Sequence, residues 1–98
     1  MDKKIYLNNL YDYYSKLFTE KQCSYYEDYY FNDLSLSEIA ENNNVSRNAV
    51  HSQIKIVEEK LELYENLLGL YKKSLEIKKL LDGSKIENDI KKRIEDLI

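Results

Sequence analysis

The sequence contains no proline and no tryptophan, and it has two glycines, one cysteine and one histidine in 98 residues. Without proline, and with glycine this rare, few positions interrupt a helix, and no segment alternates apolar and polar residues as a strand does. One cysteine and one histidine cannot form an intrachain disulfide or a Cys/His metal site. These absences predict an all-α chain that uses no metal or cofactor, in which Cys23 packs at least partly instead of acting as a reactive thiol.

Long apolar runs and a strong excess of basic residues are also absent. No run approaches the roughly 20 apolar residues of a membrane span, and the N-terminus lacks the apolar core of a signal peptide. We therefore expect a cytoplasmic protein with no membrane partner. The formal net charge of -3 argues against a general nucleic-acid coat protein, and the length predicts a single domain over residues 1–98.

The best-specified stretch is residues 35–54, which read SLSEIAENNNVSRNAVHSQI. Ser35 and Glu38 have the spacing of a capping box, which predicts the start of a helix. The asparagines at 42–44 then interrupt the apolar pattern, and Asn tolerates a left-handed turn better than other residues with a side chain. Ser46 is placed to cap a second helix. This order predicts a helix-turn-helix.

The second helix of this unit is expected to present a polar outer face, whose side chains can read base edges or hold phosphates. The predicted nucleic-acid-binding residues are Ser46, Arg47, Asn48, His51, Gln53 and Lys55. The predicted buried residues of the unit are Leu36, Ile39, Ala40, Val45, Ala49, Val50 and Ile54. Residues 35–57 carry two basic and two acidic residues, so we expect two copies to be needed for useful affinity.

Two helices are predicted before this unit. The first runs from about Lys4 to Phe18, and Thr19 with Gln22 opens a second capping box. Asn32-Asp33 is a turn pair that ends the second helix. The predicted apolar stripe of the first helix is Leu7, Leu10, Tyr11, Tyr14 and Leu17, and the predicted inward residues of the second are Tyr26, Tyr29 and Tyr30.

Eight of the ten tyrosines precede residue 31. Exposed aromatic rings can form a stacking platform for single-stranded nucleic acid. Alternatively, each ring packs in the core and leaves its hydroxyl in contact with water. The helical spacing of the tyrosines and the lack of basic residues between them favour packing.

Beyond the helix-turn-helix, apolar residues recur in steps of four and three, which is a heptad seam. A continuous helix from Arg47 to Leu81 would be about 50 Å long, more than a chain of this size can cover. The pattern therefore predicts either self-association or a fold-back near residues 66–69, where Gly69 is the weak point. We expect a homodimer, with a helical head at residues 1–54 and self-association through residues 55–98. The seam begins with Val50 and Ile54, and the predicted dimerisation residues are Val57, Leu61, Tyr64, Leu68, Tyr71 and Leu75.

Asp82-Gly83-Ser84 marks the end of the long helix, and Ser84 with Glu87 forms a third capping box. A last helix then packs on the long helix or on a partner chain through Ile86, Ile90, Ile94 and Leu97. The basic triplet at residues 91–93 has the chemistry to contact a phosphate backbone. Acidic neighbours at 95 and 96 instead favour a solvated face.

Two segments resemble known proteins. TEKQ at residues 19–22, followed by YYFNDLSLSEIAENNNVSRNAV at residues 29–50, is similar to region four of bacterial sigma factors, where a helix-turn-helix without a wing reads a promoter element. The sequence resembles the YlxM family of small bacterial helix-turn-helix proteins more closely, over nearly the whole chain. That resemblance implies a regulator linked to the signal recognition particle, because the family's gene typically neighbours that of the particle's GTPase.

The patterns and the resemblance together imply two functions. One is a non-enzymatic regulator that binds DNA through the helix-turn-helix. The alternative is a protein- or RNA-interaction module of the signal recognition particle, with its GTPase or RNA as partner and no specific DNA binding. An enzyme is not expected, since neither a Ser/His/Asp or Cys/His arrangement nor a glycine-rich phosphate loop is evident.

Overall fold

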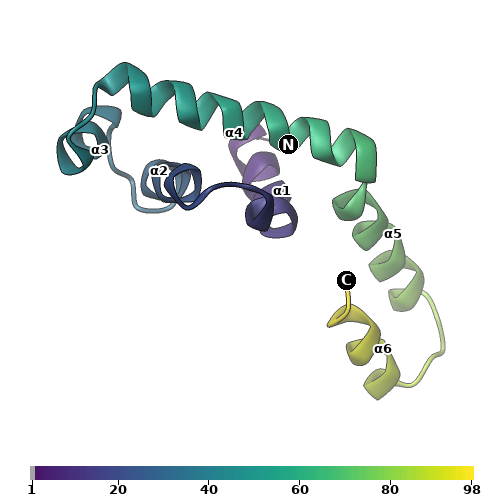
Figure 1. The fold of residues 1–98 in the computed structure, drawn as a ribbon. Helices are drawn as coiled ribbons and strands as arrows, with labels where there is room; N and C mark the ends of the chain where they lie inside the picture. Colours follow the sequence, from purple (N-terminus) through teal and green to yellow (C-terminus); the bar gives the residue numbers. More distant parts are fainter. Residues whose placement is uncertain (1) are drawn as a thin grey trace.

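The computed structural model describes residues 2–98, which form an all-α fold, as predicted (Figure 1). The elements are α1 (Lys3–Tyr14), the 3-10 helix η1 (Ser15–Leu17), α2 (Glu20–Tyr30), α3 (Leu36–Asn43), α4 (Arg47–Leu68), α5 (Leu70–Asp82) and α6 (Asn88–Glu95). The helices α1, α2 and α3 pack on one side of α4 and form with it a helical bundle, residues 3–68. Beyond α4, α5 and α6 form a C-terminal arm, residues 70–98, in a molecule that measures 55 × 24 × 24 Å.

Capping residues set the ends of the bundle helices. Thr19 and Gln22 exchange hydrogen bonds of 3.1 Å each, and Ser35 and Glu38 do so at 3.0 and 3.1 Å, so both predicted capping boxes are confirmed. The first helix ends earlier than predicted, at Tyr14, because the chain must become extended before Thr19 and tightens into η1 first. Leu17, predicted on the apolar stripe, is consequently 57% exposed.

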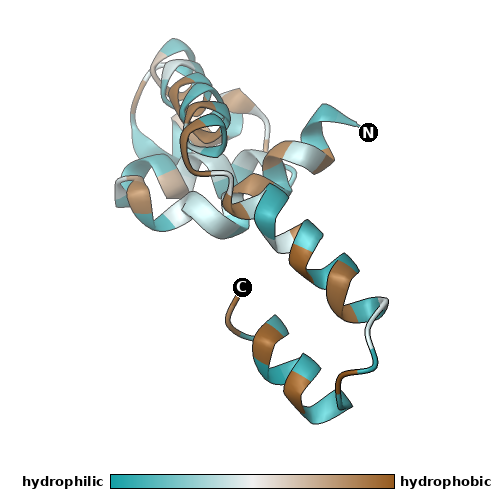
Figure 2. Ribbon diagram, turned by 90° about the vertical axis from the view of Figure 1, so that its right-hand side faces the viewer, coloured by the Kyte–Doolittle hydropathy of each residue, from teal (hydrophilic) through white to brown (hydrophobic). Residues whose placement is uncertain are grey.

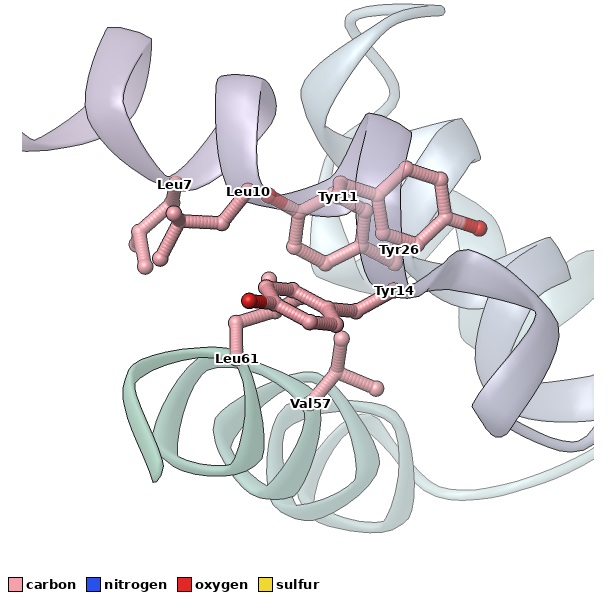
Figure 3. Close-up of a cluster of buried hydrophobic side chains, with 7 residues drawn as sticks. All are labelled: Leu7, Leu10, Tyr11, Tyr14, Tyr26, Val57 and Leu61. Atoms are coloured by element: carbon pink, nitrogen blue, oxygen red, sulfur yellow. The ribbon is translucent and has the colours of Figure 1, made fainter. Parts of the chain in front are cut away.

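The larger core lies between α1, α2 and α4 (Figure 3). The rings of Tyr11 and Tyr26 stack there, with centroids 4.4 Å apart. Their hydroxyls donate to polar groups at the edge of the core, Tyr11 to Glu27 at 2.6 Å and Tyr26 to Asn8 at 2.8 Å. The rings of these two tyrosines pack in the core as predicted, whereas their hydroxyls, which were expected to contact water, bond to Glu27 and Asn8. The buried members of this core are Leu7, Leu10, Tyr11, Tyr14, Tyr26, Val57 and Leu61.

The buried face of α2 is rotated relative to the prediction. Tyr26 is buried and Tyr30 half-buried, but Tyr29 is 38% exposed and Tyr25, which was not predicted, is 2% exposed. The reason is that α2 lies between α1 and the α3–α4 pair, so that its buried face extends to Tyr25. Cys23 is half-buried and donates to the carbonyl oxygen of Ser15 at 3.4 Å, in agreement with a packing role.

The first half of the heptad seam is buried inside the chain instead of at an interface between chains. Val50 and Ile54 pack under α3, and Val57 and Leu61 pack under α1 and α2. Val57 and Leu61 have no exposed surface. Their predicted dimerisation role is therefore corrected: they form the core, because the three preceding helices cover more of α4 than the sequence indicated.

The long helix is interrupted at Gly69, which adopts a left-handed conformation with φ 63° and ψ 30°. Of the two alternatives that the sequence left open, the break near residues 66–69 is therefore present. The other predicted dimerisation residues flank this break: Tyr64 and Tyr71 are half-buried, and Leu68 and Leu75 are 47% and 48% exposed.

In the arm, α6 turns back alongside α5 (Figures 1 and 2). The predicted capping box of Ser84 and Glu87 does not form. The hydroxyl of Ser84 instead donates to the carbonyl oxygen of Leu81 at 2.7 Å and closes the end of α5, so α6 begins only at Asn88. No side chain within α6 is buried, although bands of apolar residues run along both arm helices (Figure 2).

Candidate nucleic-acid interface

The helix-turn-helix consists of α3, a tight turn and the first half of α4. A small core of Tyr25, Ile39, Ala40, Val50 and Ile54 holds the two helices together. In the turn, Asn44 has the left-handed conformation predicted for this segment, with φ 54° and ψ 44°. The side-chain amide of Asn43 donates to the carbonyl oxygen of Ile39 at 2.7 Å, which ties the end of α3 together. This packing fixes the orientation of α4 against α3.

Ser46 caps the start of α4, as predicted, because its hydroxyl oxygen accepts a 3.1 Å hydrogen bond from the backbone of Ala49. Ala49 was predicted to be buried and is exposed. Val50 and Ile54 lie at the centre of the buried face, and Ala49 lies about 100° around the helix from Val50. The residues of the predicted interface that are exposed here are Ser46, Arg47, Asn48, His51 and Lys55, and Ser52, which is not among the predicted binding residues, is exposed beside them.

Gln53 does not share this face. It is half-buried, and its side-chain oxygen accepts a 3.1 Å hydrogen bond from the side-chain amide of Gln22 in α2. The bond fixes α4 against α2. Gln53 therefore supports the position of α4 and does not lie with the exposed residues His51, Ser52 and Lys55.

The charge of the exposed face is close to balanced. Arg47 and Lys55 supply two cations, and Glu38 and Glu41 in α3 supply two anions. The backbone N–H of Ser35, and then its side chain, hydrogen-bond to the carboxylate of Glu38 and lower the pKa of that group below its usual range. Glu38 therefore remains ionised in neutral solution, and phosphate attraction by one unit is weak.

Lys21 in α2 is a further cation beside this unit that the sequence did not single out. Its Nζ lies 5.9 Å from the ring centroid of Tyr25, and Tyr25 packs directly under α3 and α4. Lys21 lies fourteen positions before Ser35, where the helix-turn-helix begins. It lies beside this unit because α2 packs against α3 and α4. Neither helical periodicity nor a motif indicated that Lys21 lies beside the helix-turn-helix.

Three other features could indicate function: metal-binding clusters, membrane-spanning helices and the basic triplet of α6. Within residues 2–98, no three His, Cys, Asp or Glu side chains are grouped closely enough to hold a metal ion. In the same part of the chain, no helix combines the length and apolar character needed to cross a bilayer. The basic triplet of α6 lies in the arm, at a distance from the helix-turn-helix (Figure 1).

Taken together, the left-handed turn, the capped second helix and its exposed polar face define a helix-turn-helix protein. A family model described as "Putative helix-turn-helix protein, YlxM / p13 like" matches residues 1–98. The chain belongs to this family, UPF0122, and the resemblance to the YlxM family is confirmed.

Individual relatives match over almost their full length. The chain is 45% identical to UPF0122 protein YlxM of Bacillus subtilis (strain 168), an alignment that covers 99% of this chain and 94% of the relative. It is 44% identical to a UPF0122 protein of Bacillus licheniformis, with 100% and 92% covered. A UPF0122 protein of Fusobacterium nucleatum is also 44% identical, with 100% and 94% covered. These matches establish a helix-turn-helix family and name no reaction.

Proposed function

We propose that this protein is a non-enzymatic regulator that binds DNA as a homodimer through the first turns of α4. The observation that carries the proposal is the exposure of Arg47, Asn48 and His51 on a helix start that is capped and packed against α3. In helix-turn-helix proteins, residues at this end of the second helix contact base edges in the major groove.

Each exposed side chain suits a particular contact. The guanidinium of Arg47 matches the two acceptors of guanine, and the amide of Asn48 matches the donor and acceptor of adenine. Ser46 and Lys55 have the chemistry of phosphate contacts, which position the helix without reading sequence. His51, one turn after Arg47, faces the same groove.

A dimer is proposed because the charges of one helix-turn-helix are nearly balanced and attract phosphate only weakly. Two recognition helices about 34 Å apart would reach successive major grooves and roughly double the free energy of binding. The surface for a second copy is provided by large apolar side chains that remain exposed around the end of α4 and along α5. These are Leu63, Leu67, Leu68, Leu70, Leu75 and Leu80, which are 43–73% exposed.

Selection of bound sequences from a random DNA pool, followed by fluorescence anisotropy at several salt concentrations, tests the proposal. Arg47→Ala should weaken binding to the selected sequence by about 1–3 kcal/mol. Arg93→Ala is the matched control, because Arg93 is the other arginine of the chain, is exposed and lies in α6. Failure of the wild-type protein to select any sequence at low salt would exclude sequence-specific DNA binding.

A second candidate function is a protein- or RNA-interaction module of the signal recognition particle. The exposed leucines support it, since such a surface also suits a protein partner. In this case the particle's GTPase or RNA should co-purify with the wild type and with Arg47→Ala. A double variant, Leu75→Ser with Leu80→Ser, should lose the partner. Retention of the partner by that variant, or absence of both partners from the wild-type sample, would contradict this candidate.

A further inference from the structure

The direction in which the arm leaves the bundle is set at one junction. α4 ends at Leu68, Gly69 bends the chain, and α5 begins at Leu70. A helix that starts immediately after such a bend has backbone N–H groups in its first turn with no partner inside the helix. The partners of these groups therefore decide whether the bend is stable.

Two side chains of the bundle accept hydrogen bonds from the first three backbone N–H groups of α5. The hydroxyl oxygen of Tyr14 accepts from the backbone of Leu70 at 3.0 Å. The carboxylate of Glu65 accepts from Tyr71 at 3.1 Å through one oxygen and from Lys72 at 3.0 Å through the other. The cap of α5 thus comes from α1 and α4, while Gly69 itself supplies no side-chain cap.

Tyr14 and Glu65 are also bonded to each other, by a 2.6 Å hydrogen bond from the phenol to the carboxylate. They are 1% and 8% exposed. Burial, and next the bond to Glu65, raises the pKa of Tyr14 to about 12, so the phenol remains a donor in neutral solution. A carboxylate at a helix N-terminus is further stabilised by the helix dipole.

Additional contacts hold α5 against α1. The hydroxyl of Tyr13 donates to Ser74 at 2.7 Å, and Ser74 is 2% exposed. The amide of Asn9 donates to the hydroxyl of Tyr71 at 3.2 Å. The bend is therefore supported over the first two turns of α5.

The sequence pattern alone favours a different geometry. The heptad seam passes through Gly69 without interruption, from Leu68 to Tyr71 and Leu75. In a straight helix, the first N–H groups of α5 would bond to carbonyl groups one turn earlier, and Tyr14 and Glu65 would lose these partners. A straight and a bent junction therefore compete.

We propose that Tyr14 and Glu65 are positioning residues, which hold the α4–α5 junction bent and so set the direction of the arm relative to the recognition helix. For a dimer joined through its arms, this direction sets the separation of the two recognition helices, a consequence that rests on the proposed function. The bend itself is a property of the free chain and is testable without DNA.

Distance measurement between two spin labels tests the proposal. Labels are attached at Ser52→Cys in α4 and Lys79→Cys in α5, both exposed positions, in a Cys23→Ser background. Labelled protein is diluted with unlabelled protein, so that only distances within one chain are recorded. The parent should show one narrow distance. Tyr14→Phe and Glu65→Gln should each add a longer distance, because the first removes the acceptor for Leu70 and the second places an amide donor beside backbone donors.

Tyr11→Phe is the matched control. Tyr11 is 5% exposed and donates to the carboxylate of Glu27 at 2.6 Å, so the substitution removes the same type of bond inside the bundle and away from the junction. Its distance distribution should equal that of the parent. Unchanged distributions in Tyr14→Phe and Glu65→Gln would overturn the proposal, and so would an equal change in Tyr11→Phe.

Gly69→Ala provides an independent variant if Tyr14→Phe or Glu65→Gln fails to fold. A Cβ at this position meets no atom closer than 3.9 Å, so the substitution acts on backbone conformation and not on packing. Alanine disfavours the left-handed conformation and favours a continuous helix, which should shift the bent-to-straight ratio about 30-fold toward straight. An unchanged distance in Gly69→Ala would show that no straight state competes. Because no DNA is present, a failed DNA-binding assay would leave these results intact.

Discussion

The helical bundle and the C-terminal arm are both built from amphipathic helices, but they bury their apolar faces to very different extents. Twelve apolar side chains of the bundle are buried, whereas Leu81 is the one buried apolar side chain that the structure describes in the arm. In the bundle, each of α1, α2 and α3 lies against α4, so each of these three helices buries apolar side chains against it. In the arm, α5 lies against α1 and the end of α4, and α6 turns back alongside α5.

This difference shows that amphipathic pattern and burial are separate properties. A helix of eight residues, such as α6, is marginal by itself in water, and packing supplies most of the stability of short helices in proteins. The arm is therefore the part of the molecule with the least packing to stabilise its helices.

Leucine truncation should separate the two regions most clearly. Leu61 has no exposed surface, and Leu61→Ala should lower the free energy of unfolding by about 2–5 kcal/mol through lost burial and a residual cavity. Leu80 is 73% exposed, and Leu80→Ala should change that free energy by no more than about 0.5 kcal/mol. Urea denaturation measures both values. Equal losses of unfolding free energy in the two variants would contradict the difference in burial between the bundle and the arm.

Alkaline pH should destabilise the bundle. Burial, and then the bond to Glu65, raises the pKa of Tyr14 from 10.0 to about 12, and burial is also the main cause of the raised pKa values of Tyr11, Tyr26 and Tyr30. A raised folded-state pKa means that the folded chain holds its protons more tightly than the unfolded chain. The stability from Tyr14 is complete below pH 10 and declines as the pH rises toward 12.

A pH titration followed by phenolate absorbance and by circular dichroism checks this expectation. Helix loss and tyrosine ionisation should occur together in that range. Ionisation of all tyrosines near pH 10 without loss of helix would show that the rings are not protected.

Capping serines should also differ between the regions. Ser35→Ala removes the acceptor for Glu38 and should cost about 1 kcal/mol of stability. Ser84→Ala should cost less, because Ser84 caps no helix start and α6 begins only at Asn88. Thermal unfolding of the two variants gives the comparison, and a larger loss for Ser84→Ala would show that the arm is more tightly coupled to the bundle than its burial indicates.

Mild acid should produce the smallest effect, at the start of α3. Hydrogen bonds from Ser35 lower the pKa of Glu38, so its contribution is present above the usual value of 4.5 and is lost as the pH falls below it. Carboxyl resonances in an NMR titration report this pKa directly. A Glu38 titration at or above 4.5 would show that the capping box is not occupied in solution.

Predictions from sequence succeeded where neighbouring residues decide the outcome. The boxes at Thr19 and Ser35, the cap at Ser46 and the left-handed turn at Asn44 each depend on residues within about four positions. The polar residues at the start of α4 were also found, since a cap and a periodic apolar face locate the opposite face of a helix.

Predictions failed where packing between distant segments decides. Gln53 turns toward Gln22, and Val57 and Leu61 lie under α1, because helices from earlier in the chain cover those sides of α4. Periodicity identifies an apolar seam but does not identify what covers it. Tyr25 is buried and Tyr29 is exposed for the same reason, since α2 lies between α1 and the α3–α4 pair.

Local sequence is enough to predict that this chain is all-α, where its bundle helices begin, and that residues 35–54 form a helix-turn-helix. These features arise from bonds between residues a few positions apart. Packing between distant segments, in contrast, places the first half of the heptad seam in the core and bends the chain at Gly69. At the bend, the first N–H groups of α5 bond to Tyr14 and Glu65, which are 51 positions apart and also bond to each other. A contact over that separation forms only when the bundle brings the two side chains together.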